Sequence, residues 1–438
     1  MGMVSRRLGR HAQVTASPSI PTTDSEPILR SSAIFPDLRA AEALDPVTMS
    51  ALRRRAVLEG CKWDPQVGDV DTLTSFPLVL RRTVWKQLAA QAQRLAAEAA
   101  AAEEEISQRP QLLRKLGLPS VLCRLLADQT TPTPSAGRVT RFDFHYTSQG
   151  WRISEANSDV PGGFSEASHF TELMAEHFPA LRPAGNPGQY WSDALADAAD
   201  PSGVIALLSA PGFMEDHQVI AYLAARLRER GCRPHLAKPE QILWHDGFAH
   251  LETAWHSGPV DAIVRFYQAE WLSRLPERVG WRNLLKGGKT RVANPALAVI
   301  SESKRFPLVW NQLSTPLPAW RTLLPETRDP RDAPWSTDQA WLLKTAMCNT
   351  GDTVSIRELM RPHDWLRTRL AAYLEPGKWV AQRRFESIPI STPIGPRHVC
   401  VGVYTVNGLA AGAYARLSEK PLIDFSAADV ALLLEDDD

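Results

Sequence analysis

The segment 141–157 constrains the fold of this chain more than any other stretch of the sequence. Polar and apolar residues alternate over 141–146 and again over 151–157, and the turn dipeptide Gln149-Gly150 separates the two runs. Alternation with a period of two is typical of a β-strand, and a short turn that contains glycine joins antiparallel neighbours. The sequence therefore predicts a β-hairpin at this point.

The polar residues of this hairpin share one spacing. Arg141 and Asp143 are two residues apart on the first strand, and so are Glu155 and Asn157 on the second. Each pair therefore projects to one face of its strand. Two carboxylates and an amide oxygen are hard ligands suited to Mg²⁺, with phosphate oxygens completing its shell, and Arg141 could hold charge that develops on a transferred phosphoryl group. The alternative is a solvent-facing hairpin with ordinary surface charges.

Two lysines follow segments that resemble strands. Lys304 comes after residues 291–303, and Lys344 ends the run 341–344 before a loop of small residues that contains Gly351. A lysine ahead of a flexible loop suits contact with the phosphates of a nucleotide, although the sequence contains no G-x-x-x-x-G-K-[ST] motif. The alternative for each is an ordinary surface lysine.

The remaining pattern indicates an α/β or α+β fold. Helix-forming residues dominate 84–105 and 111–127, and residues 203–237 have the pattern of a strand, a helix and a second strand. Strand-like runs return near the C-terminus.

Composition excludes several classes of partner. Lysine plus arginine and aspartate plus glutamate both number 49, so the formal net charge is zero and no global positive field favours nucleic acid or an anionic membrane. The longest apolar stretch, 204–213, is too short to span a bilayer. Five cysteines without a C-x-x-C pair are typical of reduced thiols, which predicts a cytoplasmic protein.

One segment approaches the nucleophile elbow of serine hydrolases. Residues 163–167 have the sequence GFSEA, in which the last glycine of G-x-S-x-G is missing. A hydrolase that uses Ser165 is therefore an alternative function. Otherwise we expect the Ser165 hydroxyl to cap the start of a helix.

Four ordered blocks resemble the glutathionylspermidine synthase family, ATP-grasp ligases whose nucleotide-binding fold is circularly permuted. The resemblance runs from about 138 to 432 and covers the synthetase part of the family, without the amidase domain that some members carry. The blocks are R-x-D-F followed by E-x-N (Arg141, Asp143, Phe144, Glu155, Asn157), N-P…K (Asn294, Pro295, Lys304), Lys344 with its loop to Gly351, and the strand residue Gln382 followed by a strand that contains Arg416.

The resemblance implies that these residues bind ATP and Mg²⁺ and act on an acyl phosphate. The implied roles are magnesium ligation by Asp143, Glu155 and Asn157, nucleotide binding by Lys304, Lys344, Gly351 and Gln382, and stabilisation of the transferred phosphoryl group by Arg141 and Arg416.

The chemistry of the family phosphorylates a carboxylate, and an amine then attacks the acyl phosphate to give an amide, ADP and phosphate. The resemblance therefore implies a small-molecule or peptide carboxylate and an amine as substrates. Glu215 and Asp216 would recognise the amine. Their alternative role is that of acidic residues at a helix N-terminus.

The sequence also departs from the family. Thr345 follows Lys344 where the family has proline and a loop rich in glycine and arginine, and Val160 and Gly162 replace small hydroxyl residues near bound glutathione. The altered loop favours an alternative function, a homologue that binds nucleotide without turnover.

We divide the chain into four parts on this basis. The parts are a flexible lead (1–30), a helical section (31–137), a permuted ATP-grasp region (138–432) that includes a preATP-grasp-like βαβ unit (200–265), and an acidic tail (433–438).

Overall fold

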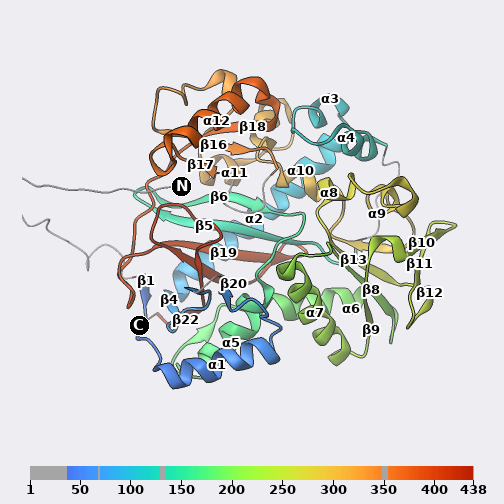
Figure 1. Ribbon diagram of the computed structural model, residues 1–438, viewed down its shortest axis with the longest axis horizontal. Coiled ribbons are helices and arrows are strands. Elements are labelled where there is room, and N and C mark those ends of the chain that lie inside the picture. Colours follow the sequence, from blue (N-terminus) through green and yellow to red (C-terminus); the bar gives the residue numbers. More distant parts are fainter. Residues whose placement is uncertain (1–36, 68–69, 129–134, 348–353, 438) are drawn as a thin grey trace, which may run out of the picture. The chain divides into compact units, whose positions relative to one another are not determined.

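The computed structural model describes residues 37–67, 70–128, 135–347 and 354–437. Its fold is mixed α/β, with several separate sheets (Figure 1). The largest is antiparallel and has the strand order β21-β20-β19-β5-β6. Its strands are β5 (Val139–Thr147), β6 (Gly150–Asn157), β19 (His398–Val406), β20 (Leu409–Ser418) and β21 (Ala428–Val430).

The predicted hairpin is confirmed as β5 and β6. Asp143 lies opposite Glu155, and Arg141 lies opposite Asn157, with a shift in register just after Asp143. The alternate residues of the two strands, such as Phe142, are buried in the main hydrophobic core. The pattern of polar and apolar residues therefore separates the two faces of the sheet, as the period of a strand requires.

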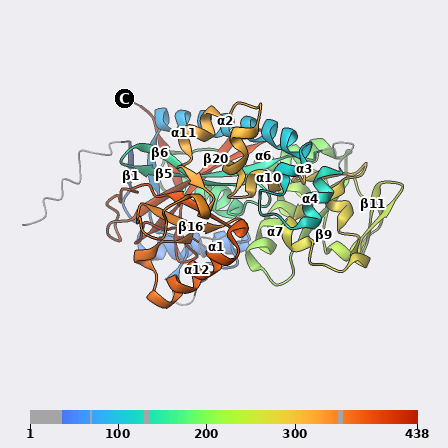
Figure 2. The same cartoon turned by 90° about the horizontal axis from the view of Figure 1, so that it is seen from above.

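Helix α2 (Arg82–Ser107) covers the apolar side of this sheet. Its buried residues recur at intervals of three and four, at Leu88, Ala92, Leu95 and Ala99, which gives one apolar stripe along the helix. The stripe packs on β19 and β20 and against α10 (Ala298–Glu302) and α11 (Pro318–Leu323). Figure 2 shows α2 along the sheet, next to α11.

The predicted helix at 84–105 is confirmed, but the second, at 111–127, is wrong as a single helix. The structure has two short helices there, α3 (Pro110–Leu113) and α4 (Ser120–Ala127). Gly117 adopts a left-handed conformation at φ 71°, which ends a helix, and Pro119 then resets the chain direction.

The section 31–137 also contains strands. Besides α1 (Pro46–Leu58), it supplies β1 (Leu38–Ala40) and β4 (Leu78–Arg81), which pair with each other. Strand β22 (Leu432–Glu435) runs parallel to β4, so most of 433–437 is not a solvated acidic tail. The cause is the apolar run Leu432–Leu434, which is buried.

The predicted βαβ unit is confirmed in a parallel sheet with the order β14-β13-β8-β9. It consists of β8 (Val204–Ser209), α7 (Met214–Glu229) and β9 (Arg233–Ala237), beside β13 (Ala262–Phe266) and β14 (Arg291–Ala293). Every residue of β8 is buried, which is typical of a parallel strand that is covered on both faces.

A third sheet has the order β15-β18-β16-β17 and carries α12 (Pro362–Leu374). Its strands are β15 (Thr327–Arg328), β16 (Trp341–Thr345), β17 (Val354–Ser355) and β18 (Trp379–Arg383). The other elements are β2 (Gln66–Val67), β3 (Val70–Asp71), a π-helix (Glu166–Phe170), α5 (Thr171–Ala175), β7 (Arg182–Pro183), α6 (Pro187–Ala198), β10 (Ile242–His245), β11 (Phe248–Glu252), β12 (Ser257–Pro259), α8 (Ala269–Leu272) and α9 (Arg282–Lys286), together with short 3₁₀ helices.

Within the described ranges, no helix combines the length and the apolar character that crossing a membrane requires.

Candidate functional site

Asp143 is the centre of an arginine network on β5. Both of its oxygens accept hydrogen bonds from Arg141, from Nε at 2.7 Å and from Nη2 at 3.1 Å. Arg416 on β20 donates Nη2 at 2.7 Å, and the Asn157 amide donates at 3.2 Å. Burial alone would raise the pKa of Asp143, but the charges of Arg141 and Arg416 hold that pKa below its ordinary value. The carboxylate is therefore ionised.

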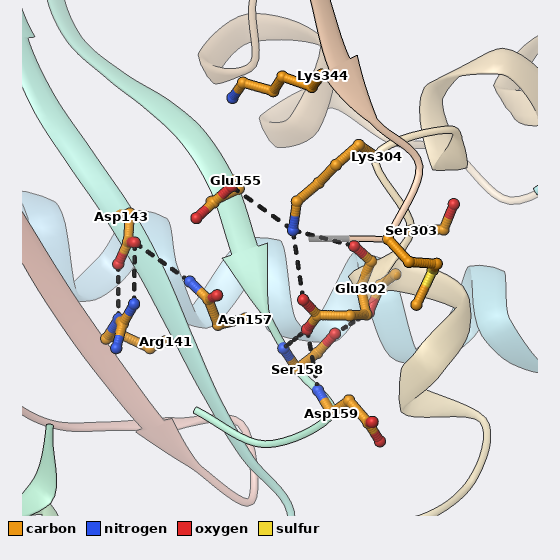
Figure 3. A network of polar contacts seen from close by, with 12 residues as sticks. Arg141, Asp143, Glu155, Asn157, Ser158, Asp159, Glu302, Ser303, Lys304 and Lys344 are labelled. Carbon is orange, nitrogen blue, oxygen red and sulfur yellow. Dashed lines mark hydrogen bonds and ion pairs between the residues drawn. The ribbon is translucent and has the colours of Figure 1, made fainter. Parts of the chain in front are cut away.

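Glu155 faces lysines instead. Its Oε2 lies 3.6 Å from the Nζ of Lys304 (Figure 3). Burial would raise the pKa of Glu155, yet the charges of Lys304 and Lys344 lower the pKa below its ordinary value. Two ionised carboxylates thus lie opposite each other across the hairpin.

Glu302, the last residue of α10, fixes the position of Lys304. The Lys304 ammonium donates to the backbone oxygen of Glu302 at 3.2 Å and to its Oε1 at 3.3 Å. The other carboxylate oxygen accepts from the backbone N–H groups of Ser158 and Asp159. Glu302 therefore ties the lysine to the end of β6 (Figure 3). Glu302 was not among the predicted site residues, although an acidic residue two positions before a predicted site lysine was a usable signal.

Lys344 joins the third sheet to the hairpin. It lies on β16, and its Nζ donates to the backbone oxygen of Ser154 on β6 at 3.0 Å. Lys304 is tied to the end of β16, because its backbone N–H donates to the carbonyl oxygen of Ala346 at 2.8 Å. The ammonium groups of both predicted phosphate lysines therefore reach β6, that of Lys344 at Ser154 and that of Lys304 at Glu155.

A cavity lies between the third sheet and the polar face of the hairpin. Gln382 on β18 lines it and donates Nε2 to the Thr327 hydroxyl at 3.0 Å. A smaller cavity, which includes Lys304, adjoins it through shared lining residues. The lining residues that carry polar or reactive groups in the larger cavity are Asp143, His145, Ser154, Glu155, Lys344, Gln382, Arg383, Arg384, Cys400 and Arg416.

Two further cavity residues were not predicted as part of the site. Burial lowers the pKa of His145 to about 4, and this ring lies 3.1 Å from the Ser154 hydroxyl. Burial raises the pKa of the Cys400 thiol to about 12, which keeps the thiol protonated and unreactive. The strand alternation that identified Asp143 also places His145 on the same face.

The structure thus gathers most of the predicted site residues around one place. Arg141, Asp143, Glu155, Asn157, Lys304, Lys344, Gln382 and Arg416 lie in the cavities or in the network that borders them. Gly351 lies outside the described residues.

Asn294, from the N-P…K block, clamps the hairpin. Its side chain accepts from the Val139 N–H at 2.8 Å and donates to the carbonyl oxygens of Val139, Ser158 and Asp159. These contacts hold the start of β5 against the end of β6. Asn294 therefore positions the site without entering its cavities.

Glu215 and Asp216 begin α7, where acidic residues interact favourably with the helix N-terminus. The side chain of Glu215 reaches solvent. Partial burial and the carboxylates of Asp64 and Glu166 raise its pKa, and the charge of Arg416 opposes that rise. Glu215 is therefore within electrostatic reach of the arginine network. Burial and Glu215 raise the pKa of Asp216 to about 7.

The hairpin carries oxygen groups of the kind that magnesium binds, although the Oδ2 atom of Asp143 already accepts hydrogen bonds from Arg141, Arg416 and Asn157. Asp143 and Glu155 are both ionised, and Asn157 donates its N–H to Asp143, which leaves its amide oxygen as a ligand. Over the residues that the structure describes, no cluster of three or more His, Cys, Asp or Glu side chains has the arrangement of a metal site. Two carboxylates and an amide would leave coordination positions for phosphate oxygens, which is how Mg²⁺ is bound beside nucleotides.

The predicted helix cap by Ser165 is wrong. Ser165 itself has helical backbone angles, and its side chain makes no capping hydrogen bond. The hydroxyl is buried and has no hydrogen-bond partner among the described residues. A nucleophilic serine needs a general base within hydrogen-bond distance, and no described residue bonds this hydroxyl, so this geometry gives the hydrolase alternative no support.

Comparison with known proteins identifies the family. The sequence matches the glutathionylspermidine synthase preATP-grasp family over residues 78–434, and the chain belongs to this family. The match begins before 138, so it includes α2. No curated protein matches the sequence.

The fold is that of the ATP-grasp synthetases. A glutathione synthetase-like effector from Globodera pallida, solved in its apo form, superposes with a TM-score of 0.60 at 12% identity, over 89% of this chain and 98% of that chain. A structure from Methylobacillus flagellatus, assigned as a gamma-glutamylcysteine synthetase, has a TM-score of 0.35 at 10% identity, over 77% and 87% of the two chains. That score is too low to add to the comparison.

Proposed function

We propose that this protein is an ATP- and Mg²⁺-dependent ligase that joins a carboxylate to an amine through an acyl phosphate. The observation that supports it is the pair of ionised carboxylates, Asp143 and Glu155, which lie opposite each other between two arginines and two lysines. A surface hairpin would have no need of three buried cations and a fourth, Arg416, that is mostly covered. Membership of a synthetase family supports the same chemistry.

The side of the cavity that carries Lys304 and Lys344, here called the lysine side, suits a nucleotide. Lys304 and Lys344 would contact the phosphates of ATP as point charges, and Gln382 would lie near the adenine, on the sheet that closes the cavity. Gly351 would belong to the loop that covers the nucleotide. Asp143, Glu155 and Asn157 would hold Mg²⁺, which neutralises phosphate charge when bound.

The side that carries Arg141 and Arg416, here called the arginine side, suits the transferred phosphoryl group. A carboxylate oxygen of the substrate attacks the terminal phosphorus of ATP, and ADP leaves as the acyl phosphate forms. Arg141 is buried, Arg416 is half-buried, and Asp143 already orients both, so they can stabilise the developing charge without rearranging. The amine then attacks the acyl carbon, and phosphate leaves with formation of the amide.

The amine would approach from the side of α7. Glu215 and Asp216 would attract its positive charge before the nitrogen loses a proton and reacts. Both substrates are small molecules, or the carboxylate is that of a peptide.

ADP release across a panel of carboxylates, with and without amines, tests this proposal. Release that requires both substrates and is lost in Glu155→Gln supports a ligase. Glu326→Gln, a surface carboxylate paired with Arg328, is the matched control and should keep full activity. ATP binding without turnover would instead indicate a nucleotide-binding homologue, and ATP-independent ester cleavage would indicate a hydrolase.

A further inference from the structure

Helix α2 carries one charged side chain on its buried face, that of Glu103. The other buried residues of this helix are apolar, and Glu103 is 1% exposed. Arg138, just before β5, donates Nη1 to Oε2 of Glu103 at 2.5 Å and Nη2 to Oε1 at 2.7 Å. The attraction in a buried ion pair is largely offset by the cost of removing two charges from water. Stability alone therefore does not explain why an apolar face contains this carboxylate.

Glu103 also binds α10, the short helix that precedes Lys304. The Ser301 hydroxyl donates to Oε1 of Glu103 at 2.5 Å. The same hydroxyl oxygen lies 2.9 Å from that of Ser158, the first residue after β6, and both serines are buried. The start of β5, the end of β6 and α10 are therefore joined at a single carboxylate.

Glu302, the next residue of α10, extends this connection to the site. Its carboxylate accepts hydrogen bonds from the backbone N–H of Ser158 and from the ammonium of Lys304 (Figure 3). Ser301 and Glu302 are consecutive in a helix of five residues, so a shift of one displaces the other. The position of the Lys304 ammonium thus depends on α2, although Glu103 lines neither of the two cavities.

We infer that Glu103 is a positioning residue: it fixes α10 against the hairpin and so holds the Lys304 ammonium in place for the phosphates of ATP. Ser301 transmits this constraint to α10, and Arg138 fixes the carboxylate itself. Helix α2 then contributes to function as well as to the core. The inference rests on the proposed ligase function, because the position of Lys304 matters to ATP only if the cavity binds it.

Calorimetric titration with ATP and Mg²⁺ tests the inference. Glu103→Gln keeps the size of the side chain but replaces one acceptor oxygen with an NH₂ group, which faces the donors of Arg138 or Ser301. The variant should bind ATP about tenfold more weakly, within the range that indirect partners of a site produce. Equal ATP affinity in folded Glu103→Gln and in the wild type would overturn the inference.

Glu105→Gln is the matched control, two residues further along α2. The Glu105 carboxylate accepts hydrogen bonds from the backbone N–H groups of Ser314 and Thr315, both at 2.8 Å, and these two residues line neither cavity. This variant should lose stability, as Glu103→Gln does, but keep the ATP affinity of the wild type. An equal loss of affinity in both variants would mean that Glu103 acts through general stability, which contradicts a positioning role.

A double-mutant cycle shows whether Glu103 acts through Lys304. Adding Glu103→Gln to Lys304→Met should change ATP affinity by less than about twofold, because the group that Glu103 positions is already absent. In the control background Lys378→Met, an exposed lysine paired with Glu375, Glu103→Gln should keep its full effect. The same effect in both backgrounds would contradict action through Lys304.

Ser301→Ala covers the case in which Glu103→Gln does not fold. It removes the hydroxyl between Glu103 and Ser158 and leaves the ion pair with Arg138 in place, so ATP binding should weaken about threefold. Ser107→Ala, which removes a hydroxyl bonded to the backbone of α2 itself, should leave the affinity unchanged. Unchanged affinity in Ser301→Ala as well would overturn the inference.

The titration of the wild type separates the two proposals. Wild-type protein that binds no ATP would contradict the ligase function, and the inference with it. Wild-type protein that binds ATP, with the same affinity in Glu103→Gln and Ser301→Ala, would support the proposed nucleotide site and contradict the role of Glu103.

Discussion

The two carboxylates of the hairpin differ in the cations that hold them. Asp143 is 1% exposed and bound by the planar guanidinium groups of Arg141 and Arg416 at 2.7 to 3.1 Å. Glu155 faces the ammonium groups of Lys304, at 3.6 Å, and Lys344. A guanidinium fixes a carboxylate through a rigid fork, whereas a lysine acts as a point charge on a flexible stem.

The difference suggests a division of labour within one cavity. The arginine side is assembled before any ligand binds, which suits the place where charge develops during phosphoryl transfer. The lysine side offers point charges, which attract phosphate oxygens with little demand on direction. Five substitutions test this account.

The largest expected effect is the loss of stability in Asp143→Ala. Removing this carboxylate leaves the buried Arg141 and the half-buried Arg416 without their shared partner, which should cost roughly 3–5 kcal/mol in the free energy of unfolding. Glu155→Ala should cost only about 1 kcal/mol, because Lys304 keeps its contacts with Glu302. Urea unfolding measures both. Equal losses in the two variants would show that the arginine and lysine sides are not different.

The next effect concerns nucleotide affinity. Lys344→Met should weaken ATP binding roughly tenfold to a hundredfold, the value of one hydrogen bond to a charged group. The same change removes the bond to Ser154, so urea unfolding should show a loss of roughly 1–3 kcal/mol. Calorimetry measures the affinity, with Lys378→Met as the control that keeps it. Normal ATP binding by Lys344→Met would contradict the assignment of Lys344 as a contact of the ATP phosphates.

A smaller effect is the pH dependence that His145 adds, since this ring lies close to both sides. Burial lowers the pKa of His145 to about 4, so between about pH 6.5 and 4 the unfolded chain binds a proton that the folded protein excludes. The contribution of His145 to stability is thus present above that window and is lost as the pH falls through it.

His145→Asn should therefore lose less stability than the wild type between pH 6.5 and 4. The difference between the two curves isolates the imidazole, because every other group is common to both proteins. Thermal unfolding at several pH values gives the two stability curves. Curves that fall in parallel would contradict the lowered pKa of His145.

The smallest expected effect is that of Ser165→Ala. The hydroxyl has no hydrogen-bond partner within the described part of the chain, so its removal should change stability by no more than about 0.5 kcal/mol and leave ADP release unchanged. Abolished activity in a folded Ser165→Ala protein would favour a hydrolase that uses Ser165 over the proposed ligase.

The hairpin shows how much of the site follows from sequence. Its strand period alone places Arg141, Asp143, Glu155 and Asn157 on one face, because side-chain direction in a strand depends only on position. The arginine side was therefore predictable apart from Arg416, which the family resemblance supplied.

Other parts of the site depend on contacts between distant segments. Likewise, Lys62 belongs to no motif, and its ion pairs with Glu166 and Asp429 exist only because the chain after α1 meets the π-helix and β21. The parallel pairing of β4 with β22 joins residues about 350 positions apart, and local pattern contains no information on such a pairing. Glu302 lies two residues before the predicted site residue Lys304, which the sequence shows. Its hydrogen bonds with the residues that follow β6 can be seen only in the folded structure.

Transfer of oxygen from carboxylate to phosphate tests the central claim most directly. A carboxylate that supports ADP release is labelled with ¹⁸O and incubated with ATP, Mg²⁺ and the amine, and the phosphate produced is analysed by mass spectrometry. If the acyl phosphate forms in the cavity that Asp143 and Glu155 line, one labelled oxygen should appear in phosphate for each amide made. Phosphate without the label, at normal amide yield, would contradict the phosphorylation of a carboxylate at this site.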